Sequence, residues 1–274
     1  MRLLKMAVSV FFDLWENFYY TRYKDLSKKD YKKIDQRYTA LFSILLDNIS
    51  GKIKMDDNFK FISWNYDLQL EKAFQSFLLD NEVKNLEELN ENYFQFKEDN
   101  KSINDVFHLN GHRGFFKNKD DSSLELNYAG DFNNYWKYLD NLLESTKDGS
   151  TNFDQYIKYA WEHKSDSEMY KSIINIFSET EVLIVIGYSF PPFNREVDQK
   201  LFSALNANRL KKIVYQDPTA NSSIIENLFE NPERFKNKIE VLNEDNSLTW
   251  FHLPNEHFMK PKSKFFGTDP IAFG

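Results

Sequence analysis

Four short apolar runs in the chain are each followed abruptly by polar residues, and segments of helical periodicity separate them. The strands predicted from these runs lie at 59–64, 105–109, 182–186 and 212–216. Strands that alternate with helices predict βαβ units in a parallel sheet, and we expect one further strand at 238–242. The run at 182–186 is the strongest. Its uninterrupted apolar character predicts a strand buried on both faces of the sheet.

The helical segments fill the spaces between these strands. Apolar residues recur near the helical period over 1–50, where a second helix is expected to run from about 32 to 49 and to stop at Gly51. Another helix begins near Asp67, and residues 81–104 read as a surface helix with loops. We expect one α/β domain over 1–253, with a helical part at 1–58, a helical insert at 131–180 and an irregular tail at 254–274. Further helices are predicted at about 194–205 and 219–229.

Composition narrows the class of protein. Of 274 residues, 41% are hydrophobic, enough for a core, and the net charge of −7 gives no electrostatic footprint for nucleic acid. Because cysteine is absent, disulfides, a thiolate nucleophile and a cysteine-based zinc site are excluded, and we expect no metal. No apolar stretch is long enough for a membrane span. Asp13 and Glu16 interrupt the apolar N-terminal stretch, so it reads as a helix and not as a signal peptide, and we expect a cytoplasmic protein.

Polar side chains at the carboxyl ends of the strands are the candidate functional residues. Ligands of open α/β sheets bind outside these ends, so several polar ends on one chain predict a shared crevice. In the first, Trp64-Asn65-Tyr66-Asp67, the Asn65 amide can both donate and accept hydrogen bonds, which suits a ribose hydroxyl or a positioned water. Asp67 fits a helix-capping turn equally well.

The second strand end carries His108 and Asn110. Side chains alternate along a strand, so both are expected on the same face. A neutral imidazole titrates near physiological pH and can act as a general base, although a structural histidine is the alternative. In the loop that follows, His112 and Arg113 are alternative contacts for a phosphate.

The third and fourth strand ends carry Gly187-Tyr188-Ser189 and Gln216-Asp217. Glycine directly after a buried strand permits a tight turn and close approach to a ligand. Ser189 can bond a phosphate or a ribose, and the helix expected near residue 194 offers its N-terminus to an anion. Asp217 stands where an acidic residue commonly bonds an adenosine ribose, and a turn at Asp217-Pro218 explains it nearly as well. No glycine-rich dinucleotide or Walker motif occurs.

Together these motifs resemble the bacterial sirtuin-like domains, NAD-hydrolysing relatives of sirtuins that occur in phage-defence proteins. Trp64-Asn65-Tyr66-Asp67 resembles the Asn-Tyr-Asp motif of that family, Gly187-Tyr188-Ser189-Phe190 resembles its Gly-x-Ser motif, and the match covers about 59–242. The resemblance implies a Rossmann-like parallel sheet with an inserted helical module. The family's opening strand and glycine-rich phosphate loop are expected to be missing. Asn110 also stands where the family usually has histidine.

The resemblance implies that NAD is the substrate and is cleaved between nicotinamide and ribose to give ADP-ribose. Asn65 and His108 would then be the catalytic residues, with Asn65 positioning the water or the ribose. The remaining candidates would bind the nucleotide, namely Asp67, Asn110, Gly187, Ser189 and Asp217. A protein deacylase is unlike this chain, because the zinc module of that class needs four cysteines.

Two alternatives from other classes stay open at this point. The first is a degenerate module that binds NAD or ADP-ribose as a signal without cleaving it. The second is an interaction protein whose sheet supports an aromatic-rich helical face, in which case a homo-oligomer is expected.

Overall fold

The computed structural model describes most of the chain, including all five strands that the sequence predicts for the parallel sheet. The described residues are 2–17, 34–49, 52–56, 58–78, 86–98, 101–116, 140, 143–144, 154–159, 162 and 167–255. The tail from 256 onward lies outside them. So does much of the expected helical insert at 131–180, of which the helix α6 (Glu168–Glu179) is described.

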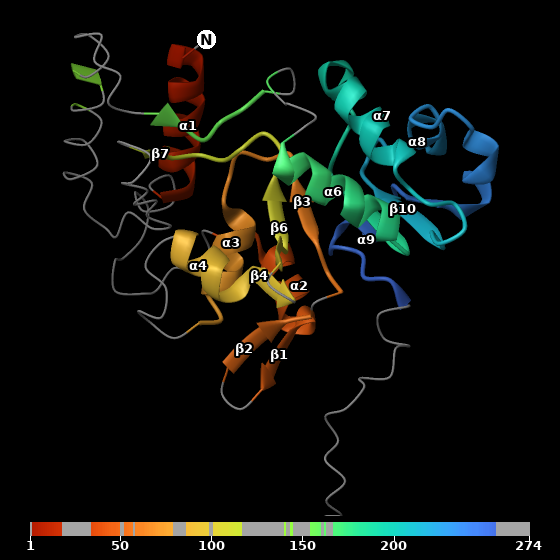
Figure 1. The fold of residues 1–274 in the computed structure, drawn as a ribbon, viewed down its shortest axis with the longest axis horizontal. Helices are drawn as coiled ribbons and strands as arrows, with labels where there is room; N and C mark the ends of the chain where they lie inside the picture. The colour runs from red at the N-terminus through yellow and green to blue at the C-terminus, as the bar shows by residue number, and fades with distance from the viewer. Residues whose placement is uncertain are drawn as a thin grey trace, which may run out of the picture.

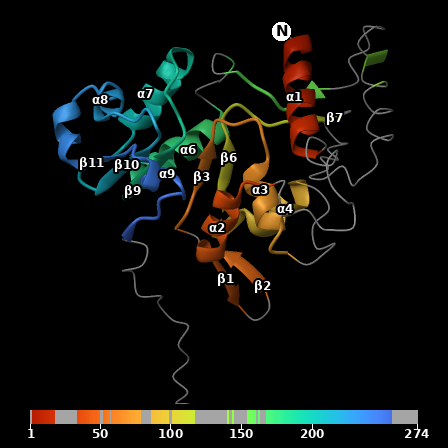
Figure 2. The ribbon, with the colours of Figure 1, turned by 180° about the vertical axis from the view of Figure 1, so that it is seen from behind.

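Two parallel sheets form the framework. In the first, β3 (Phe61–Ser63) pairs with β6 (Val106–His108), and Ile62 lies opposite Phe107. The second has the order β11-β10-β9 and joins β9 (Val182–Ile186), β10 (Lys212–Gln216) and β11 (Ile239–Leu242). All of these pairs are parallel, which confirms the predicted α/β class with parallel sheets. Figures 1 and 2 show β3 and β6 in the middle of the molecule and the three-stranded sheet to one side.

Helices occupy the connections between the strands and flank the sheets. Between β9 and β11 the chain alternates strictly, as the apolar pattern predicted. The helices are α1 (Arg2–Asn17), α2 (Gln36–Leu45), α3 (Gln69–Gln75), α4 (Leu86–Tyr93), α6, α7 (Arg195–Ser203), α8 (Ser222–Glu226) and α9 (Asp245–Leu248). Within the described residues, short 3-10 helices lie at Pro192–Asn194, Pro232–Arg234 and Lys236–Lys238. No described helix is long and apolar enough to cross a membrane.

Three antiparallel strand pairs among the described residues depart from the sequence expectations. The helix expected over 32–49 ends at Leu45, because β1 (Leu46–Ile49) turns back onto β2 (Lys52–Met55) through two residues, a common hairpin loop length. The segment 81–104, expected to hold one helix and loops, also contains β4 (Gln95–Glu98) paired with β5 (Lys101–Asn104). The third pair joins β7 (Phe115–Phe116) to β8 (Asp154–Gln155).

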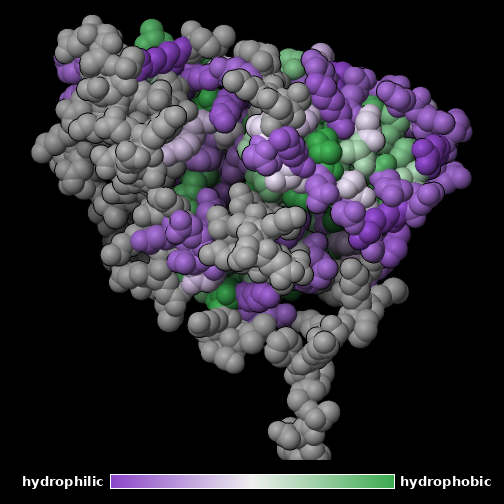
Figure 3. All heavy atoms as spheres, viewed as in Figure 1, coloured by the Kyte–Doolittle hydropathy of each residue, from purple (hydrophilic) through white to green (hydrophobic). Residues whose placement is uncertain are grey.

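Two hydrophobic cores hold these elements together. The larger packs α6, α7 and α8 against the three-stranded sheet, where Ile213 and Tyr215 of β10 are fully buried. The smaller joins α2, α3 and α4, with edge-to-face aromatic contacts of Phe74 with Phe42 and Phe94. On the face shown in Figure 3, hydrophilic side chains cover most of the described surface and hydrophobic ones appear in small groups.

The central prediction for β9 is wrong in one respect. All five of its apolar residues are only half-buried, whereas the sequence predicted burial on both faces. Burial is incomplete because β9 is an edge strand, paired only with β10 among the described residues. The cavity beside it is the most informative feature of the fold.

Candidate functional site

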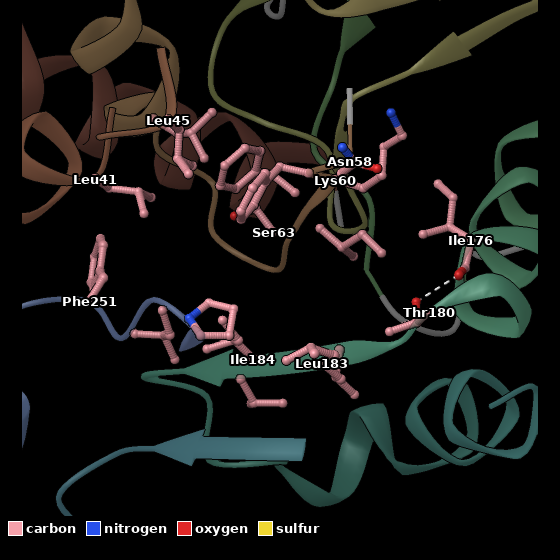
Figure 4. Close-up of a pocket in the computed structure, with 18 of the residues that line it drawn as sticks. Leu41, Leu45, Asn58, Lys60, Ser63, Ile176, Thr180, Leu183, Ile184 and Phe251 are labelled. Atoms are coloured by element: carbon pink, nitrogen blue, oxygen red, sulfur yellow. Dashed lines mark hydrogen bonds between the residues drawn. The ribbon is translucent and has the colours of Figure 1, made fainter. Parts of the chain in front are cut away.

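A cavity of about 1300 Å³ separates β3 from β9. Both strands line it along their full lengths, together with residues of α2, α6 and the segment 251–254 (Figure 4). At the carboxyl ends of the strands the lining becomes polar. There it includes Asn65, Asp67, His108, Gly187 and Tyr188, so the structure brings together four residues that the sequence singled out from three different strand ends.

His108 is held from both sides at the end of β6. Its Nε2 lies 2.5 Å from Oε1 of Glu71, and its Nδ1 lies 3.4 Å from the backbone carbonyl of Asn65. Since a carbonyl can only accept, Nδ1 carries a proton. Burial opposes the charged imidazolium, but the Glu71 carboxylate outweighs it, and the pKa of His108 is raised. Because both ring nitrogens are engaged within the protein, His108 fits a positioning group better than the general base that the sequence suggested.

Glu71 is the residue that sequence reasoning missed. It lies on α3, is only 1% exposed, and its Oε2 is buried without a hydrogen-bond partner among the described residues. Asp67 lies before the first turn of α3, and the carboxylate of Glu71 is close enough to raise its pKa. In the sequence, Glu71 stands between the apolar residues Leu70 and Ala73 of this helix, which is the signal that could have indicated it.

Asp67 makes the capping contact that the sequence offered, and its carboxyl group also has a raised pKa. Its Oδ1 accepts a hydrogen bond from the backbone N–H of Gln69 at 3.2 Å, at the start of α3. Burial, with Glu16 and Glu71 nearby, raises the pKa of Asp67 to about 6. Near neutral pH the carboxyl group is mostly ionised but sits close to its own titration, which suits a group that accepts a proton.

At the polar end of the cavity, Asn65 is the side chain most accessible for hydrogen bonding to a ligand. It is exposed, and its backbone N–H donates to Oγ of Ser63 at 3.0 Å. Its carbonyl faces His108, while its side-chain amide has no partner among the described residues. The amide is therefore free to donate to and accept from a ligand in the cavity.

The opposite wall is the turn after β9. Gly187 has a φ of +61°, a left-handed conformation that favours glycine. The ring of Tyr188 stacks on Trp64 with 5.6 Å between centroids, so the ends of β9 and β3 meet across the cavity. The hydroxyl of Tyr188 donates to Asp198 at 3.0 Å and accepts from Asn194 at 2.9 Å. This turn is thus rigidly held by α7.

Asn110, one of the predicted residues, and the glycine that follows it brace the turns at the ends of β3 and β6. Asn110 is buried, and its Nδ2 donates to the carbonyl of Trp64 at 2.9 Å, which joins the ends of β6 and β3. Gly111 follows with a φ of +66°, and a Cβ there would lie 1.7 Å from the backbone oxygen of Tyr156. Neither contact depends on a ligand, and Asn110 does not line the cavity.

A buried ion network anchors α1 behind the site. Arg113 is fully buried and donates from Nε to Glu16 and from Nη1 to Asp13, each at 2.8 Å. Glu16 also accepts from the backbone N–H of Leu68 and pairs with Lys72 at 3.0 Å. The suggestion that Arg113 meets a phosphate is therefore wrong. His112, stacked on Tyr156, has a pKa lowered to about 3 by burial and by the nearby His108, so it is neutral.

Ser189 and Asp217 stand outside the cavity lining. Ser189 is exposed, whereas Asp217 is buried and its Oδ1 accepts from the N–H and the hydroxyl of Thr219 at 2.7 and 2.6 Å. That geometry is the turn that the sequence offered as the alternative for Asp217. The first turn of α7 already carries the acidic residues Glu196 and Asp198, which weakens it as an anion site.

Within the described residues, no group of three or more His, Asp or Glu side chains is arranged to hold a metal ion. No protein-family model, curated protein or solved structure matches this chain. The site itself combines the free amide of Asn65, the Asp67 carboxyl group with its pKa of about 6 and the hydrogen-bonded pair of His108 and Glu71. These groups face the stacked ring of Tyr188 across the cavity.

Proposed function

We propose that the chain is a sirtuin-like NAD hydrolase that releases nicotinamide and ADP-ribose. One observation carries the proposal: Asn65, Asp67 and His108 gather at the carboxyl ends of β3 and β6 and face Gly187 and Tyr188 across one cavity. Nucleotides bind at this edge of open α/β sheets.

The reaction makes modest demands on the protein. The bond between the ribose carbon and the nicotinamide nitrogen breaks, and its electron pair leaves with nicotinamide, which departs neutral and needs no proton. Water adds to the ribose carbon and loses one proton. Because the transition state resembles an oxocarbenium ion, a nearby carboxylate stabilises its positive charge.

The residues divide these tasks as follows. The free amide of Asn65 orients the ribose or the attacking water. Asp67, with a pKa of about 6, supplies negative charge near neutral pH and accepts the proton that water loses. His108 is a positioning residue in this proposal, since its ring joins Glu71 to the backbone of Asn65.

Calorimetric titration with ADP-ribose tests the binding half of the proposal. The wild-type protein is expected to give saturable heat, and Asn65→Ala is expected to weaken binding at least about tenfold through loss of one or two ligand hydrogen bonds. Asn92→Ala, at an exposed asparagine of α4 far along the chain, is the matched control. Absence of heat with wild type would contradict a nucleotide site here.

A non-catalytic sensor of NAD or ADP-ribose is the second candidate. It is favoured by the engagement of both ring nitrogens of His108, which leaves the site without an imidazole base. The two candidates differ in one outcome: a sensor gives the same calorimetric binding and returns NAD intact after prolonged incubation.

A further inference from the structure

The edge of β9 has an unusual composition for an exposed strand. Its five residues, Val182–Ile186, are all apolar, yet each is half-buried, while Ile213, Val214 and Tyr215 of its neighbour β10 are 0% exposed. Exposed edge strands are normally protected by charged residues, proline or bulges, because their free backbone groups pair with other chains. β9 carries none of these within its five residues.

The hydrogen bonds on the paired side identify which backbone groups are open. The N–H of Gly187 donates to Gln216, and the carbonyl of Glu181 accepts from Lys211, so the odd-numbered residues of β9 face β10. The N–H and C=O groups of Val182, Ile184 and Ile186 therefore face the cavity.

On the other wall, the hydrogen bonds of β3 also show which of its backbone groups are open. The N–H of Phe61 donates to Asp105, and the carbonyl of Ser63 accepts from Leu109, so both residues face β6. Ile62 consequently turns its backbone groups toward the cavity. Among the described residues neither Ile62 nor the three cavity-facing residues of β9 pairs with another strand on this side.

The two open edges run in the same direction. In Figure 4 the chain passes from Lys60 to Ser63 on one wall and from Leu183 to Ile184 on the other, both toward the same end of the cavity. Strand spacing, rise and packing distance assign on the order of 160 Å³ to each residue of a strand. A strand of five residues takes on the order of 800 Å³ by this measure. It therefore fits in the cavity of about 1300 Å³ and leaves space at the polar end.

We propose that this cavity is a slot for one additional β-strand, parallel to β3 and β9, which joins the two sheets into one. α2 and α6 both line the slot, so the added strand would be buried on both faces. A strand in that position is expected to be a run of about five apolar, mostly β-branched residues. Its backbone would bond to Ile62 on one side and to Val182, Ile184 and Ile186 on the other.

The strand is a segment from outside these 274 residues. The longer stretches of the chain that the structure does not describe are 18–33, 117–139 and 256–274, and none of them contains four successive apolar residues. The proposed occupant is therefore an apolar polypeptide strand with a sequence unlike any of these. This inference does not depend on NAD, because it rests on backbone pairing alone.

A fusion protein tests the slot without altering any residue of the chain. The segment Val-Val-Ile-Val-Ile is joined ahead of Met1 through a Gly/Ser linker of about 15 residues, which reaches roughly 50 Å. In the control fusion the central isoleucine of the segment is replaced by proline, which cannot pair within a central strand. Amide hydrogen exchange is followed by NMR at Ile62, Val182, Ile184 and Ile186.

The proposal predicts that these four amides exchange at least about tenfold more slowly in the apolar fusion than in the proline fusion. Leu183 and Val185, which already face β10, provide the reference amides. Equal exchange in the two fusions would overturn the proposal. Strong protection of the four amides in the unfused protein would overturn it too, with size-exclusion chromatography then distinguishing a second copy from the chain's own residues.

Discussion

At the scale of single residues, the pKa of His108 depends on one neighbouring side chain, that of Glu71. Glu71 lies 2.5 Å from Nε2 and is 1% exposed, so its carboxylate acts in a poorly screened environment. Without it, burial alone would lower the pKa of the imidazole. The pair therefore favours the charged form of the His108 ring over the neutral form.

Glu71→Gln is expected to lower the pKa of His108, because it removes the charge that stabilises the imidazolium. An NMR titration of the His108 ring proton measures the change. Glu196→Gln, at an exposed glutamate of α7, should leave that pKa where it is. An unchanged His108 pKa in Glu71→Gln would show that the ion pair is not what raises it.

Asp67 makes the stability of the protein depend on pH. The folded carboxyl group keeps its proton up to about pH 6, while its ordinary value is 3.8. Between these values the native state binds more protons than the unfolded state, so this group's contribution to stability is present at low pH and is lost as pH rises through about 6.

Asp67→Asn removes this dependence while keeping an oxygen that can accept from the N–H of Gln69. The free energy of unfolding of the variant relative to wild type is therefore expected to increase by about 2 kcal/mol from pH 4 to pH 7. Urea unfolding at the two pH values measures it. A difference that stays constant, or that decreases with pH, would contradict the raised pKa.

At the scale of elements, a turn after a strand can require glycine for two reasons: a positive φ, or a lack of space for a Cβ atom. Two glycines of this chain allow these reasons to be distinguished. Gly111 needs both a positive φ and the space of a missing Cβ, whereas Gly187 needs only the positive φ, since nothing lies within 4 Å of its would-be Cβ. The first turn closes against Tyr156, and the second is open to the cavity.

Gly111→Ala is accordingly expected to destabilise the protein by about 3 kcal/mol or more, because the backbone at Tyr156 must move. Gly187→Ala, the matched variant, should lose only about 1 kcal/mol from the left-handed conformation. Chemical denaturation of both proteins measures the difference. Equal losses would mean that the contact with Tyr156 does not constrain the turn.

The elements also differ in how well the sequence predicted them. β9 and β10 match the predicted ranges because continuous β-branched runs bounded by polar residues have few other conformations. The β1–β2 and β4–β5 hairpins were missed because their strands are short and polar, so helical periodicity masked them. The residues 65, 67 and 108 were found because a strand end followed by a polar residue is a local signal.

At the scale of the whole molecule, the features that the sequence did not reveal are those made by distant segments. The pairing of His108 with Glu71 and the stack of Trp64 on Tyr188 join residues 37 and 124 positions apart in the chain. The gap between β3 and β9 likewise depends on which strands pair, and strand propensity does not determine pairing. Asp217 shows the converse, since a local turn accounts for it and the cavity lies elsewhere.

The central claim concerns chemistry at the polar end of the cavity, and a proton NMR time course of NAD mixed with the purified protein tests it most directly. Wild type is expected to release free nicotinamide and ADP-ribose, Asn92→Ala to match it, and Asn65→Ala to release none while remaining folded. Line broadening of intact NAD without product would identify the non-catalytic sensor. Sharp, unchanged NAD resonances, or full activity in Asn65→Ala, would contradict the proposed site.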